Sequence, residues 1–194
     1  SVIDIYFYMV RVAINGFGRI GRAFLKIAWE HPELEIVAVN DLGSLESLAY
    51  LLRHDTVYRN WGHDVKVDGT NLVIDGKTVK FVSEKDTTKL PWGDLGVDVV
   101  VESTGLFTAF DKAKFHIDCG AKRVVISAPA KGSDGSVPGE TILLGVNEEK
   151  FGTCEITSNA SCTTNAASPL IAILHKAIGI EKAVLNTVHG YTAS

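Results

Sequence analysis

The stretch NGFGRIGRA, residues 15–23, decides the fold. Its three glycines follow the apolar run at residues 10–14 and precede a helical pattern. A G-x-G-x-x-G turn in that context predicts a dinucleotide site, and a glycine-rich loop without a ligand is the alternative. Gly16 permits a tight turn, Gly18 lets the backbone approach a pyrophosphate, and Gly21 lets helix and strand pack closely. The free N–H groups at the helix N-terminus would attract the phosphates.

An acidic residue completes this pattern. Asp41 lies 20 residues after Gly21, at the end of the next apolar run. Its carboxylate would accept hydrogen bonds from the ribose hydroxyls and would repel a 2′-phosphate. No arginine follows it, because Leu42 and Gly43 stand there. The pattern therefore favours NAD over NADP.

Strand and helix patterns alternate along the rest of the chain. We expect strands at residues 10–14, 35–40, 97–103 and 123–127 and shorter ones in TILLGV and CEITSN, with helices at 19–30, 45–54 (capped by Ser44) and 109–119. Asp-Gly pairs at 68–69 and 75–76 predict antiparallel hairpins inserted into this series. The fold class is α/β, with a doubly wound, mostly parallel sheet of the Rossmann type.

The composition is that of an ordinary globular chain. The 194 residues are 46% hydrophobic and carry a net charge of −4, which gives no electrostatic footprint for nucleic acid or a membrane surface. The apolar residues 1–8 are too short to span a bilayer. We expect Met9 to be the natural start and residues 1–8 to be extra sequence, an N-terminal strand being the alternative. Three cysteines without metal-ligand spacing indicate free thiols and a cytoplasmic location, and we expect no metal site.

One of these cysteines is a candidate nucleophile. Cys162 stands at the start of an apolar helix that runs to about Ile178, where the positive helix end favours a thiolate. That effect, about 0.3–1 kcal/mol, is smaller than the roughly 1.4 kcal/mol of one pKa unit, so a basic partner is needed. Cys119 and Cys154 lack such a context and are expected to be buried and inert, which is also the alternative for Cys162.

His189 is the candidate base. A helix over residues 163–178 rises about 24 Å, and a strand over residues 183–189 returns about 23 Å. The chain thus goes out and comes back by the same length. This geometry makes an imidazole–thiolate pair of His189 and Cys162 feasible.

Seven segments together resemble phosphorylating glyceraldehyde-3-phosphate dehydrogenase, and the resemblance extends over residues 9–194. They are VAINGFGRIGR, VNDL, LPW, VVESTGLF, VVISAPAK, SNASCTTN and NTVHGYT. The resemblance implies an enzyme of glycolysis and gluconeogenesis that forms a homotetramer. Its substrates would be glyceraldehyde 3-phosphate and inorganic phosphate, and its cofactor NAD.

The resemblance also implies a mechanism and further site residues. The Cys162 thiolate would form a hemithioacetal, hydride would pass to NAD, and phosphate would cleave the resulting thioester to an acyl phosphate, with His189 as acid and base. Other residues would bind the cofactor (Arg19, Ile20, Lys85 and Ser127) or phosphate (Ser161, Thr163 and Thr192). For Ser161 and Thr163, ordinary helix capping is the alternative.

The sequence departs from the family pattern in two ways. Ala166 stands where many members have a second cysteine, and the family continues for roughly one more domain. We therefore expect an NAD-binding domain at residues 9–158, followed at 159–194 by the start of an incomplete α+β catalytic domain. We also expect the 194-residue chain to bind NAD weakly at best, to lack measurable dehydrogenase activity and to be prone to aggregate.

Two other functions stay open. A related dehydrogenase acting on erythrose 4-phosphate or another semialdehyde would use the same thioester chemistry. A stand-alone nucleotide-binding module would bind NAD without depending on a thiol.

Overall fold

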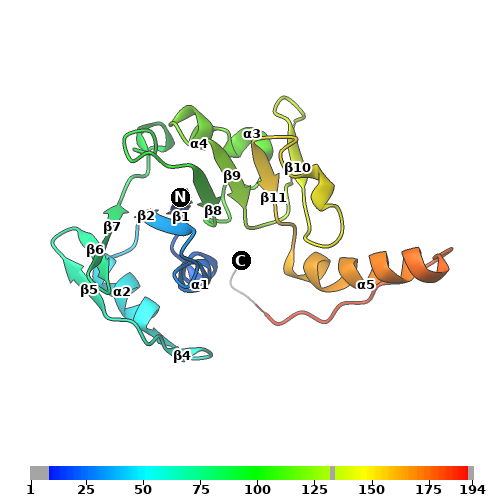
Figure 1. Cartoon of the computed structure of the whole chain (residues 1–194), viewed down its shortest axis with the longest axis horizontal. Coiled ribbons are helices and arrows are strands. Elements are labelled where there is room, and N and C mark those ends of the chain that lie inside the picture. The colour runs from blue at the N-terminus through cyan, green and yellow to red at the C-terminus, as the bar shows by residue number, and fades with distance from the viewer. Residues whose placement is uncertain (1–8, 132–133, 192–194) are drawn as a thin grey trace, which may run out of the picture.

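The computed structural model describes residues 9–131 and 134–191, and within them one sheet of nine strands forms the body of the protein (Figure 1). The strand order is β10-β11-β9-β8-β1-β2-β7-β6-β5. The first six of these and β7 run parallel: β10 Gly139–Thr141, β11 Ile156–Ser158, β9 Arg123–Ile126, β8 Val99–Glu102, β1 Val10–Asn15, β2 Leu34–Asn40 and β7 Lys77–Val82. The predicted doubly wound fold is confirmed.

The remaining strands form hairpins. β5 (Val65–Asp68) and β6 (Asn71–Ile74) pair antiparallel, and β6 pairs in the same way with β7. Asp75 and Gly76, with φ of 51° and 79°, form the two-residue turn between β6 and β7, as the Asp-Gly pair predicted. A separate small pair joins β3 (His54–Asp55) to β4 (Arg59–Asn60).

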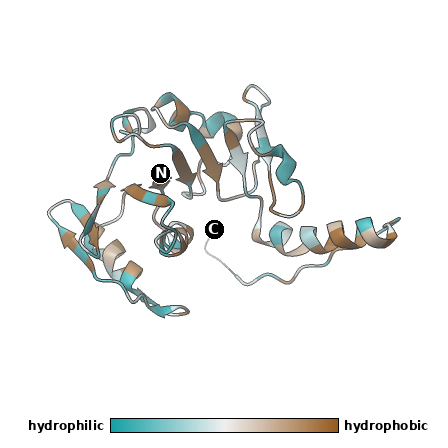
Figure 2. Ribbon diagram, viewed as in Figure 1, coloured by the Kyte–Doolittle hydropathy of each residue, from teal (hydrophilic) through white to brown (hydrophobic). Residues whose placement is uncertain are grey.

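Helices cover the two faces of the sheet with separate apolar cores. Ile14 of β1 packs in the core shared with α1 (Arg19–Ala28) and α2 (Leu45–Arg53). Ala13 points the other way, into a core that includes Trp92 and is covered by α4 (Phe115–Asp118). α3 (Phe110–Ala113) packs beside α4 on β9 and β11. In Figure 2 the central strands β8 and β9 are largely brown, the colour of hydrophobic residues. Successive residues of β1 thus pack against helices on opposite faces of the sheet, as expected for an apolar parallel strand that is buried on both faces.

Some predicted elements differ in the structure. The helix expected at 109–119 is two short helices, because the chain around Lys114 makes tighter i→i−3 hydrogen bonds. TILLGV keeps only Thr141 in β10, since Leu143 and Asn147 close a turn after it. Residues 183–189 are not a strand, because the described part of the chain offers them no hydrogen-bonded neighbour. The described residues also form the 3₁₀ turns η1 (Thr87–Lys89) and η2 (Glu148–Lys150).

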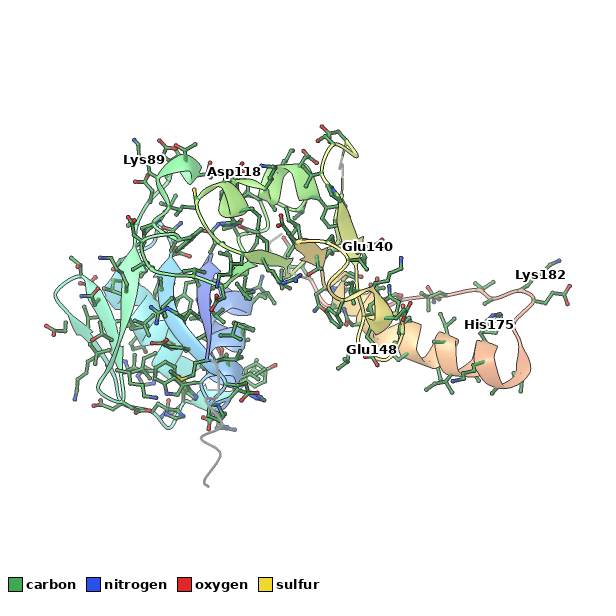
Figure 3. The ribbon with its side chains drawn as sticks, turned by 45° about the horizontal axis from the view of Figure 1, so that its top comes forward. Lys89, Asp118, Glu140, Glu148, His175 and Lys182 are labelled. Carbon is green, nitrogen blue, oxygen red and sulfur yellow. The ribbon has the colours of Figure 1, made fainter. Side chains whose placement is uncertain are left out.

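The last helix, α5 (Cys162–Ile178), projects from the body of the protein (Figures 1 and 3). None of its described side chains is buried. The following residues, 179–191, run back along it, with His175 and Lys182 near the far end (Figure 3). Within the described residues, no helix has the length and apolar character needed to cross a membrane. The N-terminal residues 1–8, expected to be extra sequence, lie outside the described residues.

Candidate functional site

The glycine turn lies where the sheet reverses its winding. From β1 the chain passes to β2 on one side, whereas β8 lies on the other side of β1. Open α/β sheets bind ligands at such a switch point, outside the carboxyl ends of the strands. The three glycines of this turn lack a side chain for different structural reasons. A Cβ on Gly16 would lie 2.6 Å from the Thr104 nitrogen, and one on Gly21 would lie 2.2 Å from the Gly16 oxygen. A Cβ on Gly18 would meet no atom of the described residues within 4 Å, so this backbone faces open space.

That open space is a cavity of about 440 Å³. Its walls come from the chain just past the carboxyl ends of β1, β2, β7 and β8 and from the loop that follows β8. The lining residues are Asn15, Gly16, Gly18, Asn40, Asp41, Leu42, Glu84, Lys85, Thr87, Leu90, Ser103, Thr104, Leu106 and Phe107. A volume of this size accommodates a small organic ligand or part of a dinucleotide.

The helix behind the turn is open for an anion. Gly18 is the N-cap of α1, and among the residues that the structure describes no side chain caps this helix end. Arg19 and Ile20 are exposed in its first turn and do not line the cavity. The space beside Gly18 would be occupied by a Cβ in any other residue. Because this space lies next to backbone N–H groups at the N-terminus of α1, it fits the pyrophosphate of a dinucleotide. The residues present therefore fit the cofactor that the sequence predicted.

Asp41 ties the glycine turn to the end of β2. Its Oδ2 accepts a hydrogen bond of 2.6 Å from the Phe17 N–H, and its Oδ1 accepts one of 2.8 Å from the Gly43 N–H. The carboxylate is thereby fixed in the cavity wall. In this position it supplies the negative charge that disfavours a 2′-phosphate.

The structure also reveals cavity residues that the sequence reasoning missed. Asn15, Asn40, Ser103 and Thr104 line the cavity, and Glu102 lies buried beneath it, with 2% of its surface exposed. A signal was present, because each of these polar residues ends or follows an apolar strand. In a parallel sheet such positions gather at one edge.

The second site pairs Cys162 with His189. The distance between Cys162 Sγ and His189 Nε2 is 3.2 Å, and both side chains are exposed. His189 Nδ1 lies 2.6 Å from the Gly190 carbonyl oxygen, so Nδ1 carries a proton and donates it there. Nε2 is then the nitrogen that faces the sulfur. The two groups also line one cavity of about 500 Å³, together with Thr163, Ala166 and Ala167 of α5 and the other residues of the segment 185–190.

The contact between Cys162 and His189 changes the pKa of both groups in the direction that favours an ion pair. The hydrogen bond from His189, with a smaller part from the Thr163 backbone, holds the pKa of the Cys162 thiol below its ordinary value. The contact with Cys162, aided by the Gly190 carbonyl, raises the pKa of His189. Thiolate and imidazolium are thus favoured together, which is the activated form of a cysteine nucleophile.

The turn before α5 fixes where the sulfur lies. Ala160 has φ of 58°, a strained conformation for a residue with a side chain. Ser161 caps the helix, accepting a hydrogen bond of 3.0 Å from the Thr164 N–H. Asn165 donates to the carbonyl oxygens of Asn159 and Ser161, at 2.7 Å and 2.9 Å. These contacts hold Cys162 at the first position of the helix.

The other predicted site residues have different positions. Lys85 lines the cofactor cavity, whereas Ser127 follows β9 outside it and donates its backbone N–H to the Glu102 carbonyl. Ser161 takes the capping role that was its alternative, and Thr192 lies outside the described residues. Cys119 and Cys154 are half-buried and donate to the backbone oxygens of Thr87 and Ile156. Burial raises the pKa of the Cys119 thiol, which agrees with its expected inertness.

Comparison with known proteins agrees with this geometry. Residues 10–110 match the family description "Glyceraldehyde 3-phosphate dehydrogenase, NAD binding domain". The chain belongs to the glyceraldehyde 3-phosphate dehydrogenase family. Residues 161–194 match the description of that family's C-terminal domain. The glycine turn, Asp41 and the cavity therefore lie in the part of the chain that corresponds to the family's NAD-binding domain, and Cys162 and His189 in the part that corresponds to its C-terminal domain.

Several members of the glyceraldehyde 3-phosphate dehydrogenase family are similar over nearly the whole chain. Glyceraldehyde-3-phosphate dehydrogenase 1 of Bacillus subtilis (strain 168) is 48% identical over 185 residues, which are 94% of this chain and 54% of that protein. The enzyme of Thermotoga maritima is 47% identical over 187 residues, 95% of this chain and 55% of that protein. The enzyme of Geobacillus stearothermophilus is 47% identical over 185 residues, which are 94% of this chain and 54% of that protein. The chain spans about half the length of the curated relatives it matches.

Proposed function

We propose that this chain carries the NAD-binding domain, at residues 9–158, and the first part of the catalytic domain, at 159–194, of a phosphorylating glyceraldehyde-3-phosphate dehydrogenase. The observation that carries the proposal is the 3.2 Å contact between Cys162 and His189 at the start of α5. A nucleophile beside its base is the minimum requirement for thioester chemistry. The relatives that are 47–48% identical over nearly the whole chain bear this enzyme's name.

In the proposed reaction the Cys162 thiolate attacks the aldehyde carbon of glyceraldehyde 3-phosphate. The imidazolium of His189 gives its Nε2 proton to the oxygen, which forms a hemithioacetal. NAD, when bound, supplies the hydride acceptor for the oxidation of this carbon. As the hydride leaves, His189 takes the hydroxyl proton and a thioester remains on Cys162. Inorganic phosphate then attacks the thioester carbon, which releases an acyl phosphate and restores the thiolate.

The other predicted residues would bind the non-reacting groups. Arg19 and Ile20, in the first turn of α1, would contact the pyrophosphate, while Lys85 and Ser127 would contact other parts of the cofactor. The phosphate groups of the substrates would bind through Ser161, Thr163 and Thr192. Support for Thr163 is its place in the cavity wall beside Cys162. We further propose a cytoplasmic homotetramer as the functional state.

A chimera tests the proposed activity directly. Residues 9–194 would be joined to the remaining C-terminal part of the Bacillus subtilis relative and assayed by the appearance of NADH. We expect oxidation of glyceraldehyde 3-phosphate that requires both NAD and inorganic phosphate, and its complete loss in Cys162→Ser. A folded chimera that oxidises erythrose 4-phosphate in preference would contradict the proposed substrate. A folded chimera without any aldehyde oxidation would contradict the proposed reaction.

NAD titration of the 194-residue chain addresses the binding-module alternative. In the proposed enzyme, bound NAD changes the rate at which iodoacetamide alkylates Cys162, since sulfur and cofactor serve one reaction. Saturable NAD binding with an unchanged alkylation rate would favour the module instead.

A further inference from the structure

A buried carboxylate lies beneath the cofactor cavity and accepts four hydrogen bonds. Glu102 Oε2 accepts from Asn15 Nδ2 at 2.6 Å and from His116 Nε2 at 2.9 Å. Its Oε1 accepts from the Thr104 N–H at 2.8 Å and from the Thr104 hydroxyl. The residue is 2% exposed, and His116, which donates to it, is fully buried. A carboxylate so far from water is costly unless donors surround it, so each of these contacts is strongly favoured.

Trp92 fixes the direction of the hydrogen bond between His116 and Glu102. The indole Nε1–H can only donate, and it lies 2.9 Å from His116 Nδ1. Nδ1 is therefore the acceptor, which leaves the ring proton on Nε2, the atom that faces Glu102. Burial lowers the pKa of His116, which agrees with a neutral ring. His116 is thus a single neutral tautomer that donates to the carboxylate.

The direction is equally fixed from the opposite side. The Glu84 backbone N–H donates to Asn40 Oδ1 at 2.9 Å, and Asn40 Nδ2 donates to the Glu84 carbonyl oxygen at 3.1 Å. Asn40 Nδ2 also donates to Asn15 Oδ1 at 2.8 Å, so neither amide can be turned over. Asn15 Nδ2 then donates to Glu102. Both chains of hydrogen bonds end at the same carboxylate.

The hydrogen bonds from Thr104 to Glu102 connect the carboxylate to the glycine turn. Glu102 holds the Thr104 backbone at the position where any Cβ on Gly16 would collide, 2.6 Å from the Thr104 nitrogen. Ser103 adds a hydrogen bond of 2.7 Å from its hydroxyl to the Gly16 carbonyl oxygen. Asn15, Asn40 and Thr104 all line the cavity. One buried anion therefore connects three of its walls: the ends of β1 and β2 and the loop after β8.

We propose that Glu102 is a positioning residue for the dinucleotide, which it does not touch: its charge holds Asn15, Thr104 and, through Asn15, Asn40 in the arrangement that the cofactor meets. The inference rests on the proposed function only in taking the cavity as the NAD site. Glutamine has the same shape, but one of its two terminal atoms is an NH₂ group, which donates. In one orientation this group would face the Thr104 N–H, and in the other it would face the donors of Asn15 and His116. Because the backbone of Glu84 and the indole of Trp92 fix those donors, the network cannot adapt to glutamine without breaking a contact.

The test compares Glu102→Gln with Ser158→Ala in the 194-residue chain. Ser158 is also buried at the carboxyl end of a strand, where its hydroxyl donates to the Ala128 oxygen, but it does not line the cavity. NAD affinity is measured by titration at a temperature at which circular dichroism shows every variant folded. We expect Glu102→Gln to bind NAD about tenfold more weakly, as expected for a buried donor left unpaired, and Ser158→Ala to bind like the unaltered chain.

Thr104→Val provides a second variant if Glu102→Gln does not fold. It keeps the side-chain shape and removes one of the four donors, so we expect NAD affinity to fall severalfold with the fold retained. A nitrogen–proton NMR correlation of the histidine rings supplies a readout that general destabilisation does not change. We expect His116 to carry its proton on Nε2 at neutral pH.

Each outcome has a defined meaning. An Nδ1–H or doubly protonated His116 overturns the proposed network. Equal NAD affinity of Glu102→Gln and the unaltered chain overturns the positioning role while leaving the proposed function intact. Saturable NAD binding by the unaltered chain that leaves the backbone amide NMR signals of Gly16, Gly18 and Thr104 unchanged contradicts the NAD site itself, and the positioning role falls with it.

Discussion

Gly16 and Gly18 belong to the same turn, and they lack a side chain for different reasons. Gly16 has φ of 91° and no room for a Cβ, whereas Gly18 has φ of −71° and faces open space. We expect Gly16→Ala to lower the free energy of unfolding by about 2 kcal/mol or more, from strain and collision. Gly18→Ala should cost less than about 1 kcal/mol, the usual effect at an N-cap, and should still weaken NAD binding.

Urea denaturation and NAD titration of both variants check this distinction. The expected pattern is a stability defect in one variant and a binding defect in the other. Equal stability losses in the two variants would contradict the separate roles that the structure gives these glycines.

The Cys162–His189 contact predicts a pH profile. Because the pKa of Cys162 is lowered and that of His189 raised, thiolate forms at a lower pH than in an ordinary cysteine. We expect His189→Asn to move the alkylation midpoint of Cys162 upward, toward the ordinary thiol value near 8.5. Iodoacetamide rates between pH 5 and pH 10 (roughly the range that brackets both groups), with the modified residue located by mass spectrometry, measure this shift. A profile that the substitution leaves unchanged would exclude the ion pair.

At the scale of elements, His63 joins the end of α1 to the β6–β7 turn. Its Nδ1 lies 2.6 Å from Asp75 Oδ2 and its Nε2 lies 2.8 Å from Glu30 Oε1. The Trp61 ring packs on the imidazole, with 4.3 Å between ring centroids. The hydrogen bond to Asp75, with a smaller part from Glu30, raises the pKa of His63. Protonated His63 therefore stabilises the packing of α1 against the hairpin.

This contact gives stability a dependence on pH with a definite sign. Since the pKa of His63 is higher in the folded than in the unfolded protein, its contribution is complete below about pH 6.5 and is lost as pH rises through the folded value. We expect His63→Gln to lower stability by less than about 1 kcal/mol at mildly acidic pH, as for other exposed ion pairs, and by much less in alkaline solution.

Urea denaturation of the unaltered chain and of His63→Gln at both pH values measures the effect. His31→Gln is a suitable control, because within the described part of the chain His31 forms its ion pair with Glu33, two residues away. A stability difference for His63→Gln that grows with pH would contradict the assigned sign.

Elements whose partners are near in sequence were predictable from the sequence. The Ser44 cap, the Asp75-Gly76 turn and the strands around the glycine turn all depend on local chemistry. Residues 183–189 have strand-forming composition, but a strand also needs a hydrogen-bonded neighbour, and the described residues supply none. The break near Lys114 likewise depends on how α3 and α4 pack on the sheet, which periodicity does not reveal.

At the scale of the whole molecule, the cofactor part is packed and α5 is not. Leu170, Ile173 and Ile178 of α5 are 59%, 65% and 80% exposed. Grouped exposed apolar side chains favour association. We expect the chain to self-associate as its concentration rises, and the triple substitution of these residues by Lys to suppress this without altering NAD affinity. Sedimentation velocity provides the measurement, and a monomer at all concentrations before substitution would contradict the expectation.

The two sites differ in how far the sequence predicted them. Gly16, Gly18, Asp41, Cys162 and His189 were predictable, because spacing and chain geometry place them. Glu102 and His116 were not, since their importance comes from four elements that meet below the cavity. A buried charge is recognised only when its donors are known.

The proposed function requires a dinucleotide bound at the carboxyl ends of β1 and β8. The most direct measurement is an NAD titration of the isotope-labelled chain, followed through its backbone amide NMR signals. We predict that the largest changes occur at residues 16–21, at Asp41 and at Ser103 and Thr104. Saturable binding that leaves these signals in place and shifts others instead would contradict the account.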